Sequence, residues 1–287
     1  MIGTLDYKMD ENIAKQKKMK VISHLKKLDS LLIAFSGGVD STFLLFLAHQ
    51  TLGENVMAVT ANSAIYPIRE TENAHTFAHE KGVQHVVFES NEMSLPAFVS
   101  NDADRCYWCK QHMFQALLKM AGEKGIENIV HGANLDDLKD FRPGFRAANE
   151  AGVIAPLIDA QLTKQEIRFL SKEMGLSTWD KPSMPCLATR IPYGSPITKE
   201  KLKMVEEAEA FLLEQGFSSI RVRYHDSVAR IEINSKELKS IMGEGLRKAI
   251  VDKFRETGFQ HIALDLEGYI SGKTNRGLKN YLKGNNK

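Results

Sequence analysis

The chain has 287 residues, of which 43% are hydrophobic and 26% are charged, and its formal net charge is +2. This composition is typical of globular proteins, and the small net charge excludes the strongly basic surface of many nucleic-acid-binding proteins. No signal peptide precedes the first predicted helix, and no apolar run reaches the roughly 18 residues that a membrane span needs. We therefore expect a cytoplasmic protein with room for two domains, and neither a membrane nor a nucleic acid is an expected partner.

Residues 31–48 hold two apolar runs separated by the hexapeptide SGGVDS at residues 36–41. The first run is short and ends at paired glycines, which predicts a buried parallel strand, and the second is long enough for a helix. The hexapeptide matches neither of the two common glycine-rich nucleotide-binding motifs. The sequence therefore predicts a strand, a loop of unusual composition and a helix.

The composition of this loop suits a phosphate group. Paired glycines allow backbone conformations that a side chain would forbid, so successive N–H groups can point at one anion in front of the helix, and serine hydroxyls add donors. A carboxylate is unexpected beside an anion, and Asp40 would either cap the helix or hold a cation next to the phosphates. The residues predicted to bind this phosphate group are Ser36, Gly37, Gly38, Asp40 and Ser41.

Short apolar strands alternate with helices through the first half of the chain. The patterns predict strands at residues 55–60, 84–89 and 127–131, and helices at residues 67–81 and from about residue 104 to residue 121. This alternation predicts an α/β fold with a doubly wound parallel sheet. Ligands bind at the carboxyl ends of the strands in such sheets, so the loops that contain Ala61 and Gly132 are predicted to form the walls of an adenine pocket.

The second half of the chain predicts a smaller α+β domain. Thr163 followed by Glu166 is a capping-box signature for a helix at residues 163–175. Residues 177–197 hold four of the eight prolines and lack periodicity, which indicates a functional loop and a domain boundary. Helices at residues 198–215 and 235–256 and strands at residues 219–225, 228–234 and 261–266 follow. We predict domains at residues 1–190 and 191–287.

The three cysteines leave several explanations open. Cys106 and Cys109 are spaced to share one face of a helix, and Cys186 lies in the proline-rich loop. An odd number of cysteines argues against a disulfide framework. The thiols could be buried and inert, could bind zinc with His112 as a fourth ligand, or could hold a [4Fe–4S] cluster with one iron left open. An open iron can carry a hydrosulfide, which a sulfur-transferring enzyme needs.

Five segments together resemble one family of sulfur-transferring enzymes. They are SGGVDS, DFRPG at residues 140–144, CLATRIPYG at residues 186–194, RVRYH at residues 221–225 and ARIEI at residues 229–233. Across about residues 20–275 the chain is similar to the LarE family, the pyridinium-3,5-biscarboxylic acid mononucleotide sulfurtransferases of the PP-loop ATP pyrophosphatase superfamily. The resemblance implies that ATP and Mg²⁺ adenylate a substrate carboxylate, and that sulfur then replaces the activated oxygen to build a nickel-pincer cofactor.

The resemblance also implies roles for individual residues. One branch of the family gives up the sulfur of a single cysteine, whereas another uses three cysteines and a [4Fe–4S] cluster, and Cys106, Cys109 and Cys186 match the second branch. These three thiols, together with Asp40 and Lys110, are the predicted catalytic residues, although Lys110 could instead be a solvated helix lysine. The residues implied to surround the substrate phosphate and carboxylate are Arg190, Glu209, Arg221 and Arg223.

The spacing of two of these arginines supports the same site independently. Residues 221 and 223 alternate along a predicted strand, so Arg221 and Arg223 point to one face and could bind a phosphate together. A solvated strand face balanced by Glu232 is the alternative. A tRNA thiolase of the same superfamily and a non-catalytic nucleotide-binding module are the competing functions, and we also expect a homo-oligomer. The sequence does not identify the sulfur donor.

Overall fold

The computed structural model describes residues 9–139, 143–270 and 272–273. The chain forms two compact units, which interleave along the sequence. Unit 1 comprises Met1–Asn62, Ile68–Ser90 and Lys110–Ser183, and unit 2 comprises Ser63–Pro67, Asn91–Cys109 and Met184–Lys287. The sequence predicts a single boundary between residues 190 and 191, whereas unit 2 also takes two segments from the first half of the chain.

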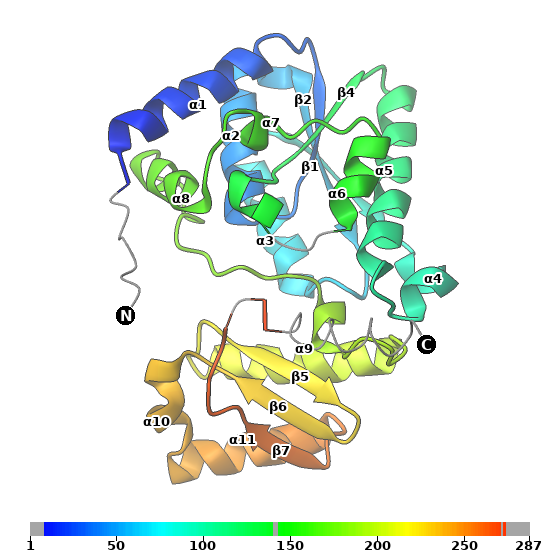
Figure 1. Cartoon of the computed structure of the whole chain (residues 1–287), viewed down its shortest axis with the longest axis vertical. Coiled ribbons are helices and arrows are strands. Elements are labelled where there is room, and N and C mark those ends of the chain that lie inside the picture. The colour runs from blue at the N-terminus through cyan, green and yellow to red at the C-terminus, as the bar shows by residue number, and fades with distance from the viewer. Residues whose placement is uncertain (1–8, 140–142, 271, 274–287) are drawn as a thin grey trace. The chain divides into compact units, whose positions relative to one another are not determined.

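A parallel four-stranded sheet in the order β3–β2–β1–β4 forms the centre of unit 1 (Figure 1). Its strands are β1 (Leu31–Ala34), β2 (Val56–Asn62), β3 (Gln84–Glu89) and β4 (Asn128–His131). Leu31, Leu32 and Ile33 are fully buried because β1 is central and both of its faces are covered. The strand order reverses between β1 and β4, and such a switch point is where doubly wound sheets bind ligands.

Helices cover both faces of this sheet. On one face α1 (Glu11–Leu25), α2 (Val39–Leu52) and α8 (Lys164–Glu173) pack against one another, and their apolar side chains join those of Leu31 and Ile33 in one cluster. Figure 1 shows α5 (Arg105–Glu123) and α6 (Gly144–Glu150) on the other side of the strands. The predicted doubly wound α/β fold is therefore confirmed.

The remaining helices of unit 1 are short or lie at the sheet edge. Helix α3 (Ile68–Glu80) packs against β2 and β3, and α7 (Pro156–Asp159) packs against α1. The capping box predicted for α8 is present: the Glu166 backbone N–H donates to Thr163 Oγ1, and the Thr163 backbone N–H donates to a carboxylate oxygen of Glu166. Two turns of 3-10 helix also belong to this unit, η1 (Gly53–Asn55) and η3 (Leu135–Lys139).

Unit 2 contains a mixed three-stranded sheet in the order β5–β6–β7. Strands β5 (Arg221–His225) and β6 (Val228–Glu232) are antiparallel, whereas β6 and β7 (His261–Leu264) are parallel. Helices α4 (Pro96–Val99), α9 (Lys199–Glu214), α10 (Leu238–Ile241) and α11 (Glu244–Glu256) belong to the same unit, with the 3-10 turns η2 (Glu92–Ser94), η4 (Leu187–Arg190) and η5 (Ser235–Glu237). This is the predicted small α+β fold.

One helix prediction is wrong, and part of one predicted motif lies outside the described residues. The single helix predicted at residues 235–256 is wrong, because η5, α10 and α11 divide it. Gly243 has extended backbone angles (φ −57°, ψ 136°) and serves as the N-cap of α11, so one continuous helix cannot form. The first three residues of the DFRPG segment, at 140–142, lie outside the described residues.

Within the described parts of the chain, no helix combines the length and apolar character needed to cross a membrane.

Candidate active site

The loop between β1 and α2 is closed by contacts among its own polar groups. Ser41 Oγ donates to the carbonyl oxygen of Gly38 at 3.1 Å and lies 3.1 Å from Ser36 Oγ, and the backbone N–H of Ser36 donates to Ser41 Oγ. Gly37 has a φ of +67°, and an added Cβ there would lie 3.1 Å from the Cβ of Ala74 in α3. The loop therefore needs glycine at position 37 both for its backbone conformation and for its packing.

Gly132, the residue directly after β4, lies against this loop. A Cβ at position 132 would stand only 2.8 Å from the backbone nitrogen of Ser41 and 2.9 Å from its Cα. The structure thus places Gly132 beside the first turn of α2, at the switch point of the sheet. Its predicted role beside adenine stays a prediction. Ala61 is the penultimate residue of β2, which extends to Asn62, so it lies at the carboxyl end of the strand rather than in the following loop, and its role beside adenine also stays a prediction.

This close approach predicts the effect of a single methyl group. Gly132→Ala should push β4 away from the first turn of α2 and lower the free energy of unfolding by about 1–3 kcal/mol, since a well-packed interior resists added volume. Urea unfolding measures the change. Gly122→Ala is the matched control, because no atom lies within 4 Å of a Cβ built there. Equal stability of the two variants would contradict the close approach.

The two carboxylate oxygens of Asp40 have different surroundings. Its Oδ2 lies 2.5 Å from Lys164 Nζ, whereas its Oδ1 is buried with no hydrogen-bond partner in the described part of the chain. Burial raises the pKa of Asp40, and the charge of Lys164 opposes that rise. The N-cap of α2 is Gly38, and α2 has no side-chain cap, so the alternative that Asp40 caps the helix is wrong. Oδ1 is instead suited to a cation.

Two lysines at this loop were missed by the sequence analysis. Lys164, the first residue of α8, pairs with Asp40, and Lys181 Nζ donates to the carbonyl oxygen of Gly37 at 3.0 Å and pairs with Glu70 at 2.9 Å. Both positions come far after the loop in sequence, one behind a helix cap and the other in the proline-rich stretch. No periodicity marks them, and only the fold brings their charges to the loop.

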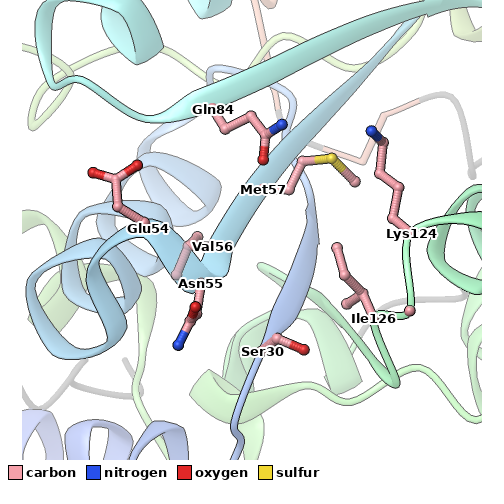
Figure 2. A pocket seen from close by; sticks show the side chains of 9 residues that line it. Ser30, Glu54, Asn55, Val56, Met57, Gln84, Lys124 and Ile126 are labelled. Atoms are coloured by element: carbon pink, nitrogen blue, oxygen red, sulfur yellow. The ribbon is translucent and has the colours of Figure 1, made fainter.

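A cavity of about 410 Å³ lies at the amino ends of the strands, whereas the loop at residues 36–41 follows the carboxyl end of β1 (Figure 2). Figure 2 shows Glu54, Gln84 and Lys124 around it, and the full lining is Ser30, Glu54, Asn55, Val56, Met57, Gln84, Lys124, Gly125 and Ile126. These residues precede or begin the strands. Because ligands of doubly wound sheets bind at the carboxyl ends, this cavity is not the predicted nucleotide site.

All three cysteines belong to unit 2, where they share neighbours. Burial raises the pKa of the Cys186 thiol and the nearby Cys106 raises it further, while the charges of Arg105 and Arg190 oppose the rise. The buried hydroxyl of Tyr66 forms a hydrogen bond with Cys109 and also interacts electrostatically with Cys186; burial raises its pKa well above the usual value. None of the three cysteines is in a disulfide, and no group of three or more His, Cys, Asp or Glu side chains in the described residues is arranged to hold a metal ion.

The predicted substrate residues also lie in unit 2, and they are buried. Arg190 forms two 2.8 Å hydrogen bonds with the carboxylate of Glu209, and Arg223 pairs with Glu232 at 2.9 Å. Burial would raise the pKa of Glu209, but the Arg190 pairing holds it below its usual value. Arg221 and Arg223 are 2% and 7% exposed, so the alternative of a solvated strand face is wrong, although Glu232 does balance Arg223.

Arg221 is buried against an aromatic ring. Its guanidinium lies over the ring of Tyr269, 4.8 Å from the centroid, and donates to the carbonyl oxygen of Ile220. Burial and the positive charge of Arg190 lower its pKa to about 10. A neighbouring anion would oppose both effects, so the surroundings of Arg221 are suited to a substrate anion.

Lys110 lies in unit 1 and is half-buried. Its Nζ is 3.7 Å from Met113 Sδ. Burial, with a contribution from the charge of Lys110, lowers the pKa of His131 to about 4. Lys110 thus stands near the end of β4, and its predicted role toward an adenylate stays a prediction.

Comparisons with known proteins agree with this arrangement. A family model described as a PP-loop domain matches residues 9–141. The pyridinium-3,5-bisthiocarboxylic acid mononucleotide synthase of Lactiplantibacillus plantarum is 33% identical over 260 residues, which are 90% of this chain and 94% of that protein. An uncharacterized protein of Synechocystis sp. is 42% identical over 252 residues, 88% of this chain and 94% of its own length.

A third relative extends the likeness to an archaeon. An uncharacterized protein of Methanocaldococcus jannaschii is 30% identical over 259 residues, which cover 89% of this chain and 98% of that protein. The likeness to the L. plantarum synthase likewise includes most residues of both units. This likeness, together with the glycine loop at the switch point of a doubly wound sheet, shows that the chain belongs to the LarE family within the PP-loop superfamily.

Proposed function

We propose that this protein is an ATP-dependent sulfurtransferase. It adenylates a carboxylate of pyridinium-3,5-biscarboxylic acid mononucleotide and converts that carboxylate to a thiocarboxylate. The observation that carries this proposal is the loop at residues 36–41, which brings together hydroxyl groups, a glycine backbone, contacts to two lysines, and a buried Asp40 oxygen that has no hydrogen-bond partner among the described residues. The relative from L. plantarum, named as the synthase of the bisthiocarboxylic acid mononucleotide, supports the choice of substrate.

In the first step, a carboxylate oxygen of the substrate attacks the α-phosphorus of ATP, and pyrophosphate leaves. The positive charges of Lys164 and Lys181 and the N-terminus of α2 stabilise the departing phosphates. Mg²⁺ is commonly held by one or two carboxylates and by phosphate oxygens, and Asp40 Oδ1 fits that requirement. The products of this step are an acyl adenylate and pyrophosphate, as expected for a PP-loop enzyme.

In the second step, a sulfur nucleophile attacks the carbonyl carbon of the adenylate, and AMP leaves with the oxygen that linked the two. Starting from hydrosulfide, the products are the thiocarboxylate, AMP and one proton. Arg221 holds an anionic group of the mononucleotide, while Arg190 and Arg223, each bound to a glutamate, position the surrounding segments. These arginines and the three thiols belong to the same unit.

Cys106, Cys109 and Cys186 would hold a [4Fe–4S] cluster. Three thiolates are a fitting donor set, because iron–sulfur clusters are held by cysteine thiolates, and the interactions of Cys186 with Cys106 and of Tyr66 with both Cys109 and Cys186 support this choice. When bound, the cluster would supply a site where sulfur is activated for transfer. The protein contributes buried surroundings, the Tyr66 hydrogen bond to Cys109, and the charges of Arg105 and Arg190 near Cys186.

Substrate-dependent pyrophosphate release tests the proposed function. With ATP and Mg²⁺, the pyridinium mononucleotide should stimulate equal release of AMP and pyrophosphate, whereas unmodified tRNA should not. Stimulation by tRNA alone would instead support the thiolase. Absence of pyrophosphate release with either substrate would favour a non-catalytic nucleotide-binding module.

The buried position of Arg221 makes a binding prediction. Arg221→Met should weaken affinity for the mononucleotide by ~1.5–3 kcal/mol, the usual range for a hydrogen bond to a charged group. Isothermal titration calorimetry measures this change. Arg230→Met is the control, since Arg230 lies on the neighbouring strand and pairs with Glu232 and Asp265. If Arg221→Met binds as tightly as the control, Arg221 has a structural role only.

A further inference from the structure

Arg168 of α8 holds the backbone of the segment at residues 177–181, which we call the strap. Its Nη1 donates to the carbonyl oxygen of Trp179 at 2.8 Å, and its Nη2 donates to the carbonyl oxygen of Lys181 at 2.7 Å. The two nitrogens of one guanidinium thus bind two carbonyl groups, which suits its rigid, planar arrangement of donors. Arg168 therefore fixes the part of the chain from which the Lys181 side chain extends.

The same face of α8 contacts both the strap and the loop at residues 36–41. Lys164, Arg168 and Lys172 follow one another at intervals of four residues, so they lie on one side of the helix. Lys172 Nζ is 4.6 Å from the centroid of the Trp179 ring. Lys164 Nζ pairs with Asp40 at 2.5 Å. One helix face thereby holds the strap in place beside the start of α2.

The ammonium group of Lys181 lies at the loop itself. It donates to the carbonyl oxygen of Gly37 at 3.0 Å and pairs with Glu70 of α3 at 2.9 Å. The Lys181 side chain is 17% exposed and that of Glu70 is 12% exposed. A lysine carries its charge on a flexible four-carbon chain, so the position of that charge depends on where the backbone is held. The two bonds from Arg168 supply that hold.

We propose that Arg168 is a positioning residue for ATP, which fixes the strap so that Lys181 meets the β- and γ-phosphates at the loop of residues 36–41. Lys181 contacts the phosphates, and Arg168 acts through Lys181. The inference rests on the proposed function in taking the phosphates of ATP as the anion. Its test needs neither the mononucleotide nor sulfur, so it can fail while the proposed function stands.

The charge of Arg168 offers a competing explanation. Burial raises the pKa of Asp40, and the charge of Arg168 opposes that rise, as the charge of Lys164 does. Arg168→Lys separates the two explanations. It keeps a positive charge near Asp40, but an ammonium group lacks the planar pair of donors that binds the carbonyl oxygens of Trp179 and Lys181.

The test compares the affinities of the full-length protein for ATP and AMP, measured with Mg²⁺ by isothermal titration calorimetry. Lys181→Met should weaken ATP binding on the order of 30-fold, as expected for a lost hydrogen bond to a charged group. Arg168→Met should weaken it on the order of tenfold, because a misplaced ammonium group still attracts the phosphates from farther away. AMP lacks the β- and γ-phosphates, so its affinity should stay within about twofold in both variants.

The double variant shows whether Arg168 acts through Lys181. Arg168→Met combined with Lys181→Met should bind ATP as weakly as Lys181→Met alone, because two residues that act as a unit do not give additive losses. Arg168→Lys should bind ATP as weakly as Arg168→Met. Lys15→Met is the matched control: it removes a partly exposed lysine that pairs with Glu173 of α8 at 2.7 Å, and it should leave both affinities unchanged.

Four results would overturn the proposal. They are an unchanged affinity of Arg168→Met for ATP, losses that multiply in the double variant, full affinity in Arg168→Lys, and a loss of AMP binding as large as the loss of ATP binding. The last of these would show that Arg168 supports the fold of the nucleotide site as a whole.

The unsubstituted protein supplies a comparison that does not depend on a variant folding. Acetic anhydride acetylates lysines, and mass spectrometry gives the rate at Lys181. ATP with Mg²⁺ should slow this reaction, whereas AMP should not, and equal rates with the two nucleotides would also overturn the proposal. If pyrophosphate release is intact in that case, only the role of Arg168 is lost. Failure of the unsubstituted protein to bind ATP would remove the proposed function as well.

Discussion

Asp40→Asn should lower the rate of AMP formation by at least ~100-fold, the size of effect seen when one electrostatic group is removed from a preorganised active site. The amide keeps the shape of the carboxylate and can still accept from Lys164. It loses the negative charge that would hold Mg²⁺ at Oδ1, the oxygen that has no hydrogen-bond partner in the described chain. The free energy of unfolding should change by less than about 1 kcal/mol, because burial already disfavours the charged form of Asp40.

Initial rates of AMP release and urea unfolding, measured on the same samples, check both parts of this prediction. Asp159→Asn is the control, since Asp159 is an exposed carboxylate in α7 of the same unit. An Asp40→Asn protein that forms AMP as fast as this control would remove Asp40 from the catalytic step. Release of ADP and phosphate by the unsubstituted protein would remove the pyrophosphatase chemistry altogether.

Single replacement of Cys106, Cys109 or Cys186 by alanine should abolish iron binding and multiple-turnover sulfur transfer together. A cluster that needs three thiolates loses its site when any one of them is absent. AMP formation should stay within about threefold of the unsubstituted rate, because the phosphate loop belongs to unit 1 and the cysteines belong to unit 2. Iron analysis, visible absorption and thiocarboxylate yield under anaerobic conditions give the three readouts.

A different pattern would identify the sacrificial mechanism. In that case only Cys186→Ala would be inactive, and the other two variants would behave like the unsubstituted protein. Cys186 would also become lighter by the mass of hydrogen sulfide after one turnover. The cluster proposal would then be wrong, while the adenylation step would remain.

Much of the fold could be predicted from the sequence, because strand limits and helix caps are set largely by residues that are close together in the chain. Strand β3 has the predicted limits of residues 84–89, and the capping box at Thr163 begins α8 as expected. The helix predicted at residues 235–256 failed because hydrophobic spacing continues across Gly243, whose backbone nevertheless leaves the helical region. Periodicity records which residues face the core, and it does not record where one glycine breaks a helix.

The candidate site was predictable only where its chemistry lies within one segment. The glycine loop could be found from its own residues, and its hydroxyl contacts agree with an anion site. Lys164 and Lys181 could not be found, because the fold brings them to that loop from more than 100 residues away. The burial of Arg221 and Arg223 was missed for a related reason: alternation along a strand shows which residues share a face, but not whether that face is covered.

The most direct test of the proposed function counts the thiocarboxylate made per chain. Iron-loaded protein is incubated anaerobically with ATP, Mg²⁺, the pyridinium mononucleotide and sulfide, and thiocarboxylate, AMP and pyrophosphate are measured together. Three products in equal amounts, each exceeding the amount of protein, are expected. Formation of AMP without thiocarboxylate, or a yield that stops at one thiocarboxylate per chain, would contradict transfer through a three-thiol cluster.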